Sequence, residues 1–242
     1  IKQKVGFLSN FSNIYIGKQN TKNLRLIKKF LKNNYSKINY PDNWSLNIKN
    51  KKYFYKEKKN IIPMKSNKIY SKGLYQNLAL SIKIALDLGI SKQIIKRTIP
   101  KIIIEGRLQY ISKGKYLKKI YKNEKIMLDG CHSSVSAKNL VSYLKEVKNN
   151  KVGILAMTKN KDHSNFLKNF KGVFNKILVV PLENNQECVP PEYLIKIAKK
   201  NNIVACKAKS LDQAIKKLSN KKSKIICIFG SLYLCGEFLR RN

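Results

Sequence analysis

The second half of the chain alternates short apolar runs with longer amphipathic segments. Apolar runs predict five buried strands, at residues 125–129, 152–157, 177–180, 203–206 and 225–229. Helical periodicity and start signals predict five helices, from about residue 135, over 162–170, over 190–200, from residue 210 and over 231–240. Strands of this kind, separated by such helices, are typical of a mostly parallel sheet covered by helices on both faces. The predicted fold class is therefore α/β.

The first half of the chain has a less regular pattern. Residues 14–16 resemble a strand, a basic helix is predicted from about residue 24 to 31, and residues 34–72 suggest short strands without clear periodicity. A helix follows over 74–88, ending at Gly89, and a short helix spans 91–97. We expect a domain boundary near Pro100, which divides the chain into domains 1–99 and 100–242.

The charge of the chain is strongly positive. There are 51 Lys and Arg residues against 13 Asp and Glu, a formal net charge of +38. A basic nucleic-acid-binding module is one interpretation. The lysines are spread over nearly every segment, however, which favours a compositional bias at solvated positions and a surface that attracts small anionic substrates. Nucleic acid is therefore the less favoured partner.

The five cysteines are at positions 131, 188, 206, 227 and 235. They include no Cys-x-x-Cys pair and their number is odd, so we interpret them as small buried hydrophobic residues rather than as a metal site or disulfides. No apolar run approaches the roughly 20 residues that a membrane helix needs. We therefore expect a cytoplasmic protein without a membrane partner.

Polar residues follow several predicted strands at their carboxyl ends, where parallel sheets bind ligands. Asp129 could accept hydrogen bonds from ribose hydroxyls, or could cap the helix that follows. Arg107, at the expected domain junction, has a planar guanidinium suited to phosphate oxygens, or could form a salt bridge between domains. His132 could orient a phosphate or make a structural hydrogen bond. Thr158–Asp162 also follows a strand, but its Lys161 and Asp162 are favoured as the start of a helix.

Four motifs in this order give a specific resemblance: Gly106-Arg107-Leu108-Gln109, Asp129-Gly130-Cys131-His132, Lys161-Asp162 and Gly230-Ser231-Leu232. Together they resemble the folylpolyglutamate synthase / dihydrofolate synthase family of the Mur ligase superfamily. The segments Ile1–Gly6 and Asn77–Ser81 resemble two further motifs of that family. The resemblance therefore covers essentially the whole chain.

The resemblance implies a fold and a set of site residues. Residues 100–242 would be a Rossmann-like C-terminal domain, and residues 1–99 the tail end of a central ATP-binding α/β domain. Asn77, Arg107 and Asp129 would bind ATP. Lys4 and His132 would be catalytic, and Lys4, once carbamylated, would bridge magnesium ions, which prefer oxygen ligands.

The activity implied by the resemblance is an ATP-dependent ligation by a monomer. ATP would phosphorylate a carboxylate of dihydropteroate or folate, and the amine of L-glutamate would attack the acyl phosphate to form an amide. Whether the substrate is dihydropteroate, a folate or both stays open.

The sequence also departs from the family pattern. The phosphate-binding loop Gly-Thr-Asn-Gly-Lys-Gly-Ser is absent, and its place in the family precedes Lys4, so we expect the chain to be a fragment that does not turn over ATP alone. Ser133-Ser134 replaces the usual Asn-Pro after His132. A catalytically inactive homologue is therefore a further alternative.

Overall fold

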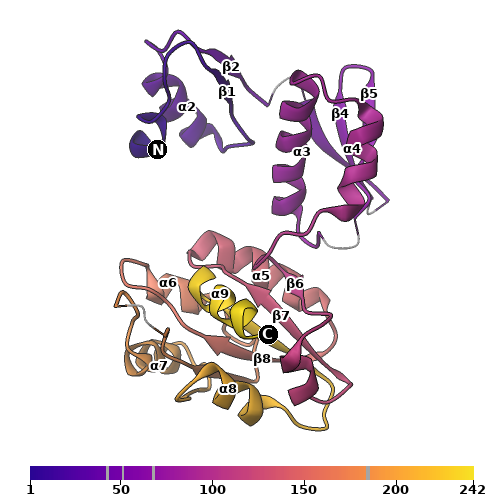
Figure 1. Ribbon diagram of the computed structural model, residues 1–242. Coiled ribbons are helices and arrows are strands. Elements are labelled where there is room, and N and C mark those ends of the chain that lie inside the picture. Colours follow the sequence, from indigo (N-terminus) through magenta and orange to yellow (C-terminus); the bar gives the residue numbers. More distant parts are fainter. Residues whose placement is uncertain (42–43, 51, 67–68, 184–185) are drawn as a thin grey trace. The chain divides into compact units, whose positions relative to one another are not determined.

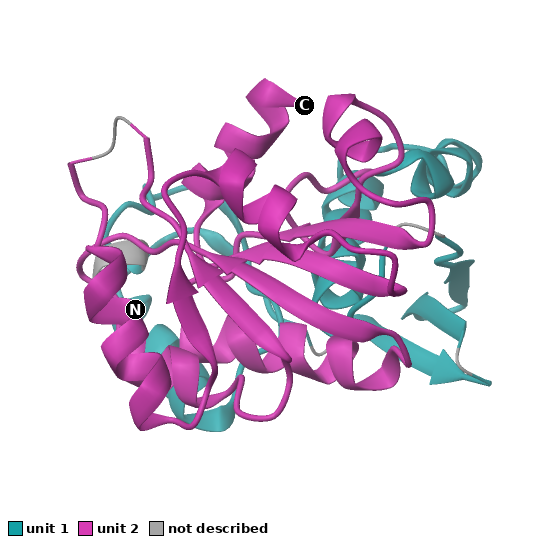
Figure 2. Ribbon diagram, turned by 90° about the horizontal axis from the view of Figure 1, so that it is seen from below, with its two compact units in different colours: residues 1–102 teal, residues 103–242 magenta. Residues whose placement is uncertain are grey.

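The computed structural model describes residues 1–41, 44–50, 52–66, 69–183 and 186–242, with backbone alone at residues 3 and 4. These residues form two compact units, unit 1 (1–102) and unit 2 (103–242), which Figure 2 colours separately. The predicted boundary, after residue 99, lies three residues before this division. The assignment of unit 1 to an ATP-binding domain stays a prediction. In the described parts of the chain, no helix is both long and apolar enough to cross a membrane.

Unit 1 contains two small sheets and the helices that pack on them (Figure 1). Strands β1 and β2 pair in parallel, whereas β3, β4 and β5 form an antiparallel meander. Its elements are α1 (Lys2–Val5), β1 (Asn13–Tyr15), α2 (Thr21–Phe30), β2 (Lys37–Asn39), β3 (Trp44–Lys49), β4 (Lys52–Glu57), β5 (Asn60–Pro63), α3 (Lys72–Asp87), α4 (Lys92–Thr98) and the 3-10 helix η1 (Ile99–Lys101).

Helix α3 is the main cover of the meander. It begins where the Ser71 side chain accepts a hydrogen bond from the Leu74 backbone N–H, and Gly89, with φ +81°, follows its C-cap. Its buried face consists of Tyr75, Leu78, Ala79 and Ile82. These side chains share one core with apolar residues of all three meander strands. The short strands expected within 34–72 are confirmed.

Unit 2 is built on a six-stranded sheet in the order β10-β9-β8-β11-β7-β6. All neighbours run parallel except β6, which pairs antiparallel with β7 at one edge. Its elements are β6 (Gln109–Tyr110), the 3-10 helix η2 (Lys115–Lys119), β7 (Glu124–Asp129), α5 (Ser134–Glu146), β8 (Asn150–Leu155), α6 (His163–Lys168), β9 (Lys176–Val179), α7 (Pro191–Lys200), β10 (Ala205–Lys207), α8 (Leu211–Leu218), β11 (Lys224–Phe229) and α9 (Leu232–Arg241).

Helices cover both faces of this sheet, as Figure 2 shows for unit 2. Apolar residues of α5, α6 and α7 belong to one core, and those of η2, α8 and α9 belong to the other. Alternation along β7 serves both cores, since Met127 faces the first while Ile126 and Leu128 face the second. The predicted α/β fold with a mostly parallel, doubly covered sheet is thus confirmed.

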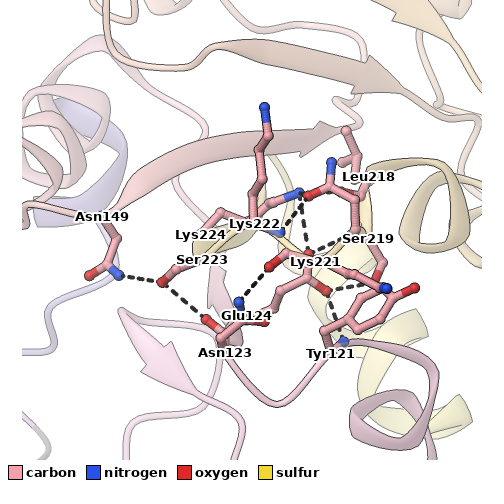
Figure 3. A network of polar contacts seen from close by, with 11 residues as sticks. Tyr121, Asn123, Glu124, Asn149, Leu218, Ser219, Lys221, Lys222, Ser223 and Lys224 are labelled. Atoms are coloured by element: carbon pink, nitrogen blue, oxygen red, sulfur yellow. Dashed lines mark hydrogen bonds and ion pairs between the residues drawn. The ribbon is translucent and has the colours of Figure 1, made fainter.

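A buried polar network joins the amino ends of the neighbouring strands β7 and β11 (Figure 3). Glu124 begins β7 and lies in register with Lys224, which begins β11. Their side chains are 0% and 5% exposed, and Lys224 Nζ lies 3.3 Å from Glu124 Oε1. Glu124 also accepts hydrogen bonds from Ser219 Oγ at 2.5 Å and from the Tyr121 N–H at 3.0 Å. Both charges are therefore compensated at the end of the sheet opposite the predicted site.

Candidate functional site

Three central strands of unit 2 end at the same level. In the register of the sheet, Phe229 at the end of β11 pairs with Asp129 of β7 and with Leu155 of β8. The chain turns sharply after β11 at Gly230, where φ is +101°. A Cβ atom added there would lie 2.6 Å from the Ala156 carbonyl oxygen, so the close approach requires glycine. The predicted ligand edge of the sheet is therefore formed by tightly packed backbone.

Asp129 is buried at this edge, with 7% of its surface exposed. Its Oδ2 accepts a hydrogen bond from the Leu108 N–H at 3.0 Å, and its Oδ1 accepts one from the Cys131 N–H at 2.9 Å. Burial raises the pKa of Asp129, although these backbone donors and the charge of Arg107 act in the opposite direction. The carboxylate thus ties the segment around residue 108 to the end of β7. Each oxygen keeps a lone pair that a further donor could use.

Arg107 lies beside Asp129 in a short turn, residues 106–109, that we call the arginine loop. Its Nη1 donates a long hydrogen bond of 3.5 Å to the Gly106 carbonyl. The same nitrogen would lie 2.9 Å from a Cβ added at Gly130, so the absence of a side chain there leaves room for the guanidinium. Among the ion pairs between described residues, none includes Arg107. The structure thus brings together Arg107 and Asp129, two of the three residues predicted to bind nucleotide.

His132 and the serines after it shape the next turn. Because the Gly130 carbonyl can only accept a hydrogen bond, His132 Nδ1, 3.0 Å away, donates it. Ser133 is the N-cap of α5 and forms a capping box with Ser136. The alternative in which Asp129 caps this helix is therefore wrong. Ser133 takes the capping position itself.

Asp162 starts a helix, as the favoured interpretation had it. At the N-cap of α6, its Oδ1 accepts a hydrogen bond from the Asn165 N–H at 3.0 Å. The side-chain hydrogen bond from Asn165 and then this backbone bond lower the pKa of Asp162. Lys161 is exposed. The pair therefore shapes the turn after β8.

The other two predicted residues belong to unit 1. Lys4 lies in α1, but its side chain is outside the described part of the structure. Asn77 is exposed on α3, and its backbone carbonyl accepts a hydrogen bond from Ser81 Oγ at 3.1 Å. The roles of Lys4 and Asn77 stay predictions.

Three of the cysteines, Cys131, Cys227 and Cys235, are buried and unpaired, in agreement with the interpretation as small hydrophobic residues. Burial raises the pKa of all three thiols. For Cys206 the interpretation is wrong, because it lies on the short edge strand β10 and is exposed. Cys188 is half-buried. The residues that the structure describes contain no group of three or more His, Cys, Asp or Glu side chains that could hold a metal.

Sequence reasoning missed the role of Gln109. Its Oε1 accepts a hydrogen bond of 2.8 Å from the Gly106 N–H and so closes the arginine loop. The signal was present in the Gly-x-x-Gln spacing, since a side chain three residues after a glycine can reach back to its backbone.

A comparison with known protein families finds a match in the second part of the chain. Residues 112–241 match the family described as "Dihydrofolate synthetase, C-terminal domain". No curated protein sequence matches the chain significantly.

Solved structures match nearly the whole chain at low sequence identity. E. coli FolC in complex with DHPP and ADP has a TM-score of 0.79 and 16% identity, over 99% of this chain and 55% of that one. A folylpolyglutamate synthase from Thermotoga maritima has a TM-score of 0.74 and 18% identity, over 98% of this chain and 56% of that one. Mycobacterium tuberculosis folylpolyglutamate synthase complexed with ADP has a TM-score of 0.77 and 14% identity, over 94% and 54%. The chain thus spans little more than half the length of these structures, and the likeness shows a shared fold.

Proposed function

Because this chain belongs to the family of dihydrofolate synthetase C-terminal domains, we propose that it is the carboxy-terminal portion of an ATP-dependent ligase. The proposed reaction joins L-glutamate to dihydropteroate, to folates or to both. Of the three structures named above, two contain ADP, and one of these also contains DHPP, which supports a nucleotide as a ligand here. The observation that carries the proposal is the placement of Arg107 beside Asp129 at the carboxyl edge of the sheet.

The chemistry of these residues suits the binding of a nucleotide. Arg107 carries a permanent charge and a planar fork of donors, so it can neutralise and orient phosphate oxygens. Asp129 can accept from ribose hydroxyls with the lone pairs that the Leu108 and Cys131 N–H groups leave free. We propose that His132 offers Nε2 to a donor group of a substrate, because its Nδ1 is engaged with Gly130.

The proposed reaction follows from the need to activate a carboxylate. ATP supplies a phosphoryl group that turns one carboxylate oxygen into a leaving group, and the glutamate amine then displaces phosphate to form the amide. Phosphoryl transfer depends on positioning and on positive charge more than on covalent help from the protein. Arg107 supplies such a charge at a defined place.

Metal binding in this proposal depends on residues beyond the described side chains. Lys4 as a carbamate would offer two oxygens to magnesium, a cation that prefers such ligands. The remaining ligands and the phosphate-binding loop would come from a segment corresponding to the part of the similar structures that the match leaves uncovered. We therefore propose that the chain alone does not turn over ATP.

The proposal is tested by measuring ADP affinity by isothermal titration calorimetry. We expect Arg107→Ala to weaken ADP binding by about tenfold to a hundredfold, because a charge-assisted hydrogen bond to phosphate contributes roughly 1.5–3 kcal/mol. Arg97→Ala, at an exposed arginine of α4, lowers the net charge equally and serves as the control. Equal affinities for the two variants would contradict the proposed role of Arg107.

Glutamate incorporation by the complete protein tests the reaction itself. We expect radiolabelled L-glutamate to appear in a pterin or folate product only when ATP is present. A protein that binds ADP but incorporates no glutamate would instead be a catalytically inactive homologue.

A further inference from the structure

The arginine loop has a backbone conformation that side chains disfavour. Gly106 has φ +63° and Leu108 has φ +46°. The left-handed region is open to glycine but costs free energy at leucine, because Cβ approaches the neighbouring carbonyl. Such residues persist when the surrounding structure holds them in place, and they cluster at functional sites.

Two hydrogen bonds hold the loop against the end of β7. The Leu108 N–H donates to Asp129 Oδ2 at 3.0 Å, and the Gly130 N–H donates to the Gly106 carbonyl at 2.7 Å. The Leu108 side chain is 2% exposed and belongs to the larger core of unit 2. These contacts fix both flanks of Arg107.

A third hydrogen bond closes the loop on itself. Gln109 Oε1 accepts from the Gly106 N–H at 2.8 Å, and the Gln109 backbone is held in β6, in register with Leu128 of β7. The amide therefore reaches from a fixed strand to the residue that precedes Arg107. Without this acceptor, the Gly106 N–H would lose its partner, and the peptide between residues 105 and 106, at the start of the arginine loop, could rotate.

We propose that Gln109 is a positioning residue that holds the arginine loop in its left-handed form and thereby directs the Arg107 guanidinium over Gly130. This inference rests on the proposed nucleotide site. A planar guanidinium binds phosphate oxygens well only when its orientation is fixed, so a loop that relaxes lowers affinity without removing the charge.

The test compares three variants of the chain. Gln109→Met keeps the length of the side chain and removes the acceptor, whereas Gln109→Glu keeps an acceptor for the Gly106 N–H. Gln213→Met is the matched control, because Gln213 Oε1, in the first turn of α8, also accepts a hydrogen bond from a preceding backbone amide, the Lys209 N–H at 2.7 Å. Hydrogen–deuterium exchange of the amides of residues 106–108 reports the loop directly and does not depend on any ligand.

We expect these amides to exchange at least about tenfold faster in Gln109→Met, because a lost hydrogen bond of this kind shifts a local opening equilibrium by that order. Exchange in Gln109→Glu and Gln213→Met should stay close to that of the unsubstituted chain. Equal exchange in Gln109→Met and Gln213→Met would overturn the inference.

ADP affinity gives the second measurement. Gln109→Met should bind ADP about tenfold more weakly than Gln213→Met, since a small displacement of a binding group has effects of this order or larger. Faster loop exchange with unchanged ADP affinity, while Arg107→Ala loses affinity, would refute the directing role of Gln109 and leave the nucleotide site intact. If Arg107→Ala binds ADP as well as the unsubstituted chain does, or if that chain does not bind ADP, the proposed site and this inference both fail.

Discussion

Two glycines of unit 2 differ in what a side chain at their position would meet. At Gly230 an added Cβ would meet the Ala156 carbonyl oxygen at 2.6 Å and Leu155 Cδ1 at 2.4 Å, in a backbone with φ +101°. At Gly172 φ is also positive, at +71°, but nothing lies within 4 Å of the added atom. A substitution at Gly230 would therefore meet both a steric clash and an unfavourable backbone conformation, whereas one at Gly172 would meet only the second.

We expect Gly230→Ala to lower the free energy of unfolding by about 2–4 kcal/mol, because a backbone oxygen cannot move away as a flexible side chain can. Gly172→Ala should cost only about 1 kcal/mol, the penalty of the left-handed backbone. Urea denaturation followed by far-UV circular dichroism measures both. Equal losses in the two variants would show that the turn after β11 can rearrange.

At the residue scale, the sequence pointed to the right part of the molecule. Arg107 and Asp129 could be predicted to lie together because the resemblance assigned both motifs to the nucleotide, and Asp129 ends a predicted strand. The hydrogen bonds of Asp129 to Leu108 and Cys131 could not be predicted, since they depend on the positive φ of Leu108, which no local propensity favours.

At the element scale, the amino ends of β7 and β11 depend on one buried ion pair. Lys224 Nζ, besides facing Glu124, donates to the Leu218 carbonyl at 2.9 Å and to Asn220 Oδ1. Because these groups are satisfied together, removing one partner leaves the other charge buried without its counterpart. The pair is therefore expected to matter more than the exposed ion pairs of the same unit.

We expect Lys224→Met to lower the free energy of unfolding by about 3 kcal/mol. The double variant Lys224→Met/Glu124→Gln should lose less free energy of unfolding than the two single variants lose together, because it no longer buries an unpaired carboxylate. Lys119→Met is the control, since Lys119 and Asp212 are 50% and 40% exposed and such pairs contribute below about 1 kcal/mol. Strict additivity in chemical denaturation would mean that the two charges do not interact.

Element positions were predictable where periodicity was strong. The helices and strands after residue 124 lie within a few residues of their predicted ranges, because buried strands and amphipathic helices have distinct periods. Strand β6, two residues long, was missed, because so short a segment has no period. The order of the strands could not be predicted, because it depends on contacts between segments far apart in the chain.

At the scale of the whole molecule, each unit has hydrophobic cores of its own. The clusters of buried residues in unit 1 involve residues up to 102, and those in unit 2 begin at residue 108. A separate core is the physical requirement for a segment to fold without its neighbour.

We therefore expect a polypeptide of residues 103–242 to fold alone. It should retain helical far-UV circular dichroism and unfold cooperatively in urea, because the whole six-stranded sheet and its five covering α-helices lie within that range. The control is the same polypeptide with Gly230→Ala, which should unfold at lower urea. A non-cooperative transition in the unsubstituted polypeptide would show that unit 2 needs contacts with unit 1.

The strand order has a consequence for synthesis on the ribosome. Strand β11, made last, lies between β7 and β8, which are made about a hundred residues and about seventy residues earlier. Until residues 224–229 emerge from the exit tunnel, the middle of the sheet is missing and the nascent chain exposes the flanks of both earlier strands. A premature stop codon before β11 would therefore remove the centre of the domain rather than its periphery, and would leave a product that chaperones and proteases recognise as unfinished.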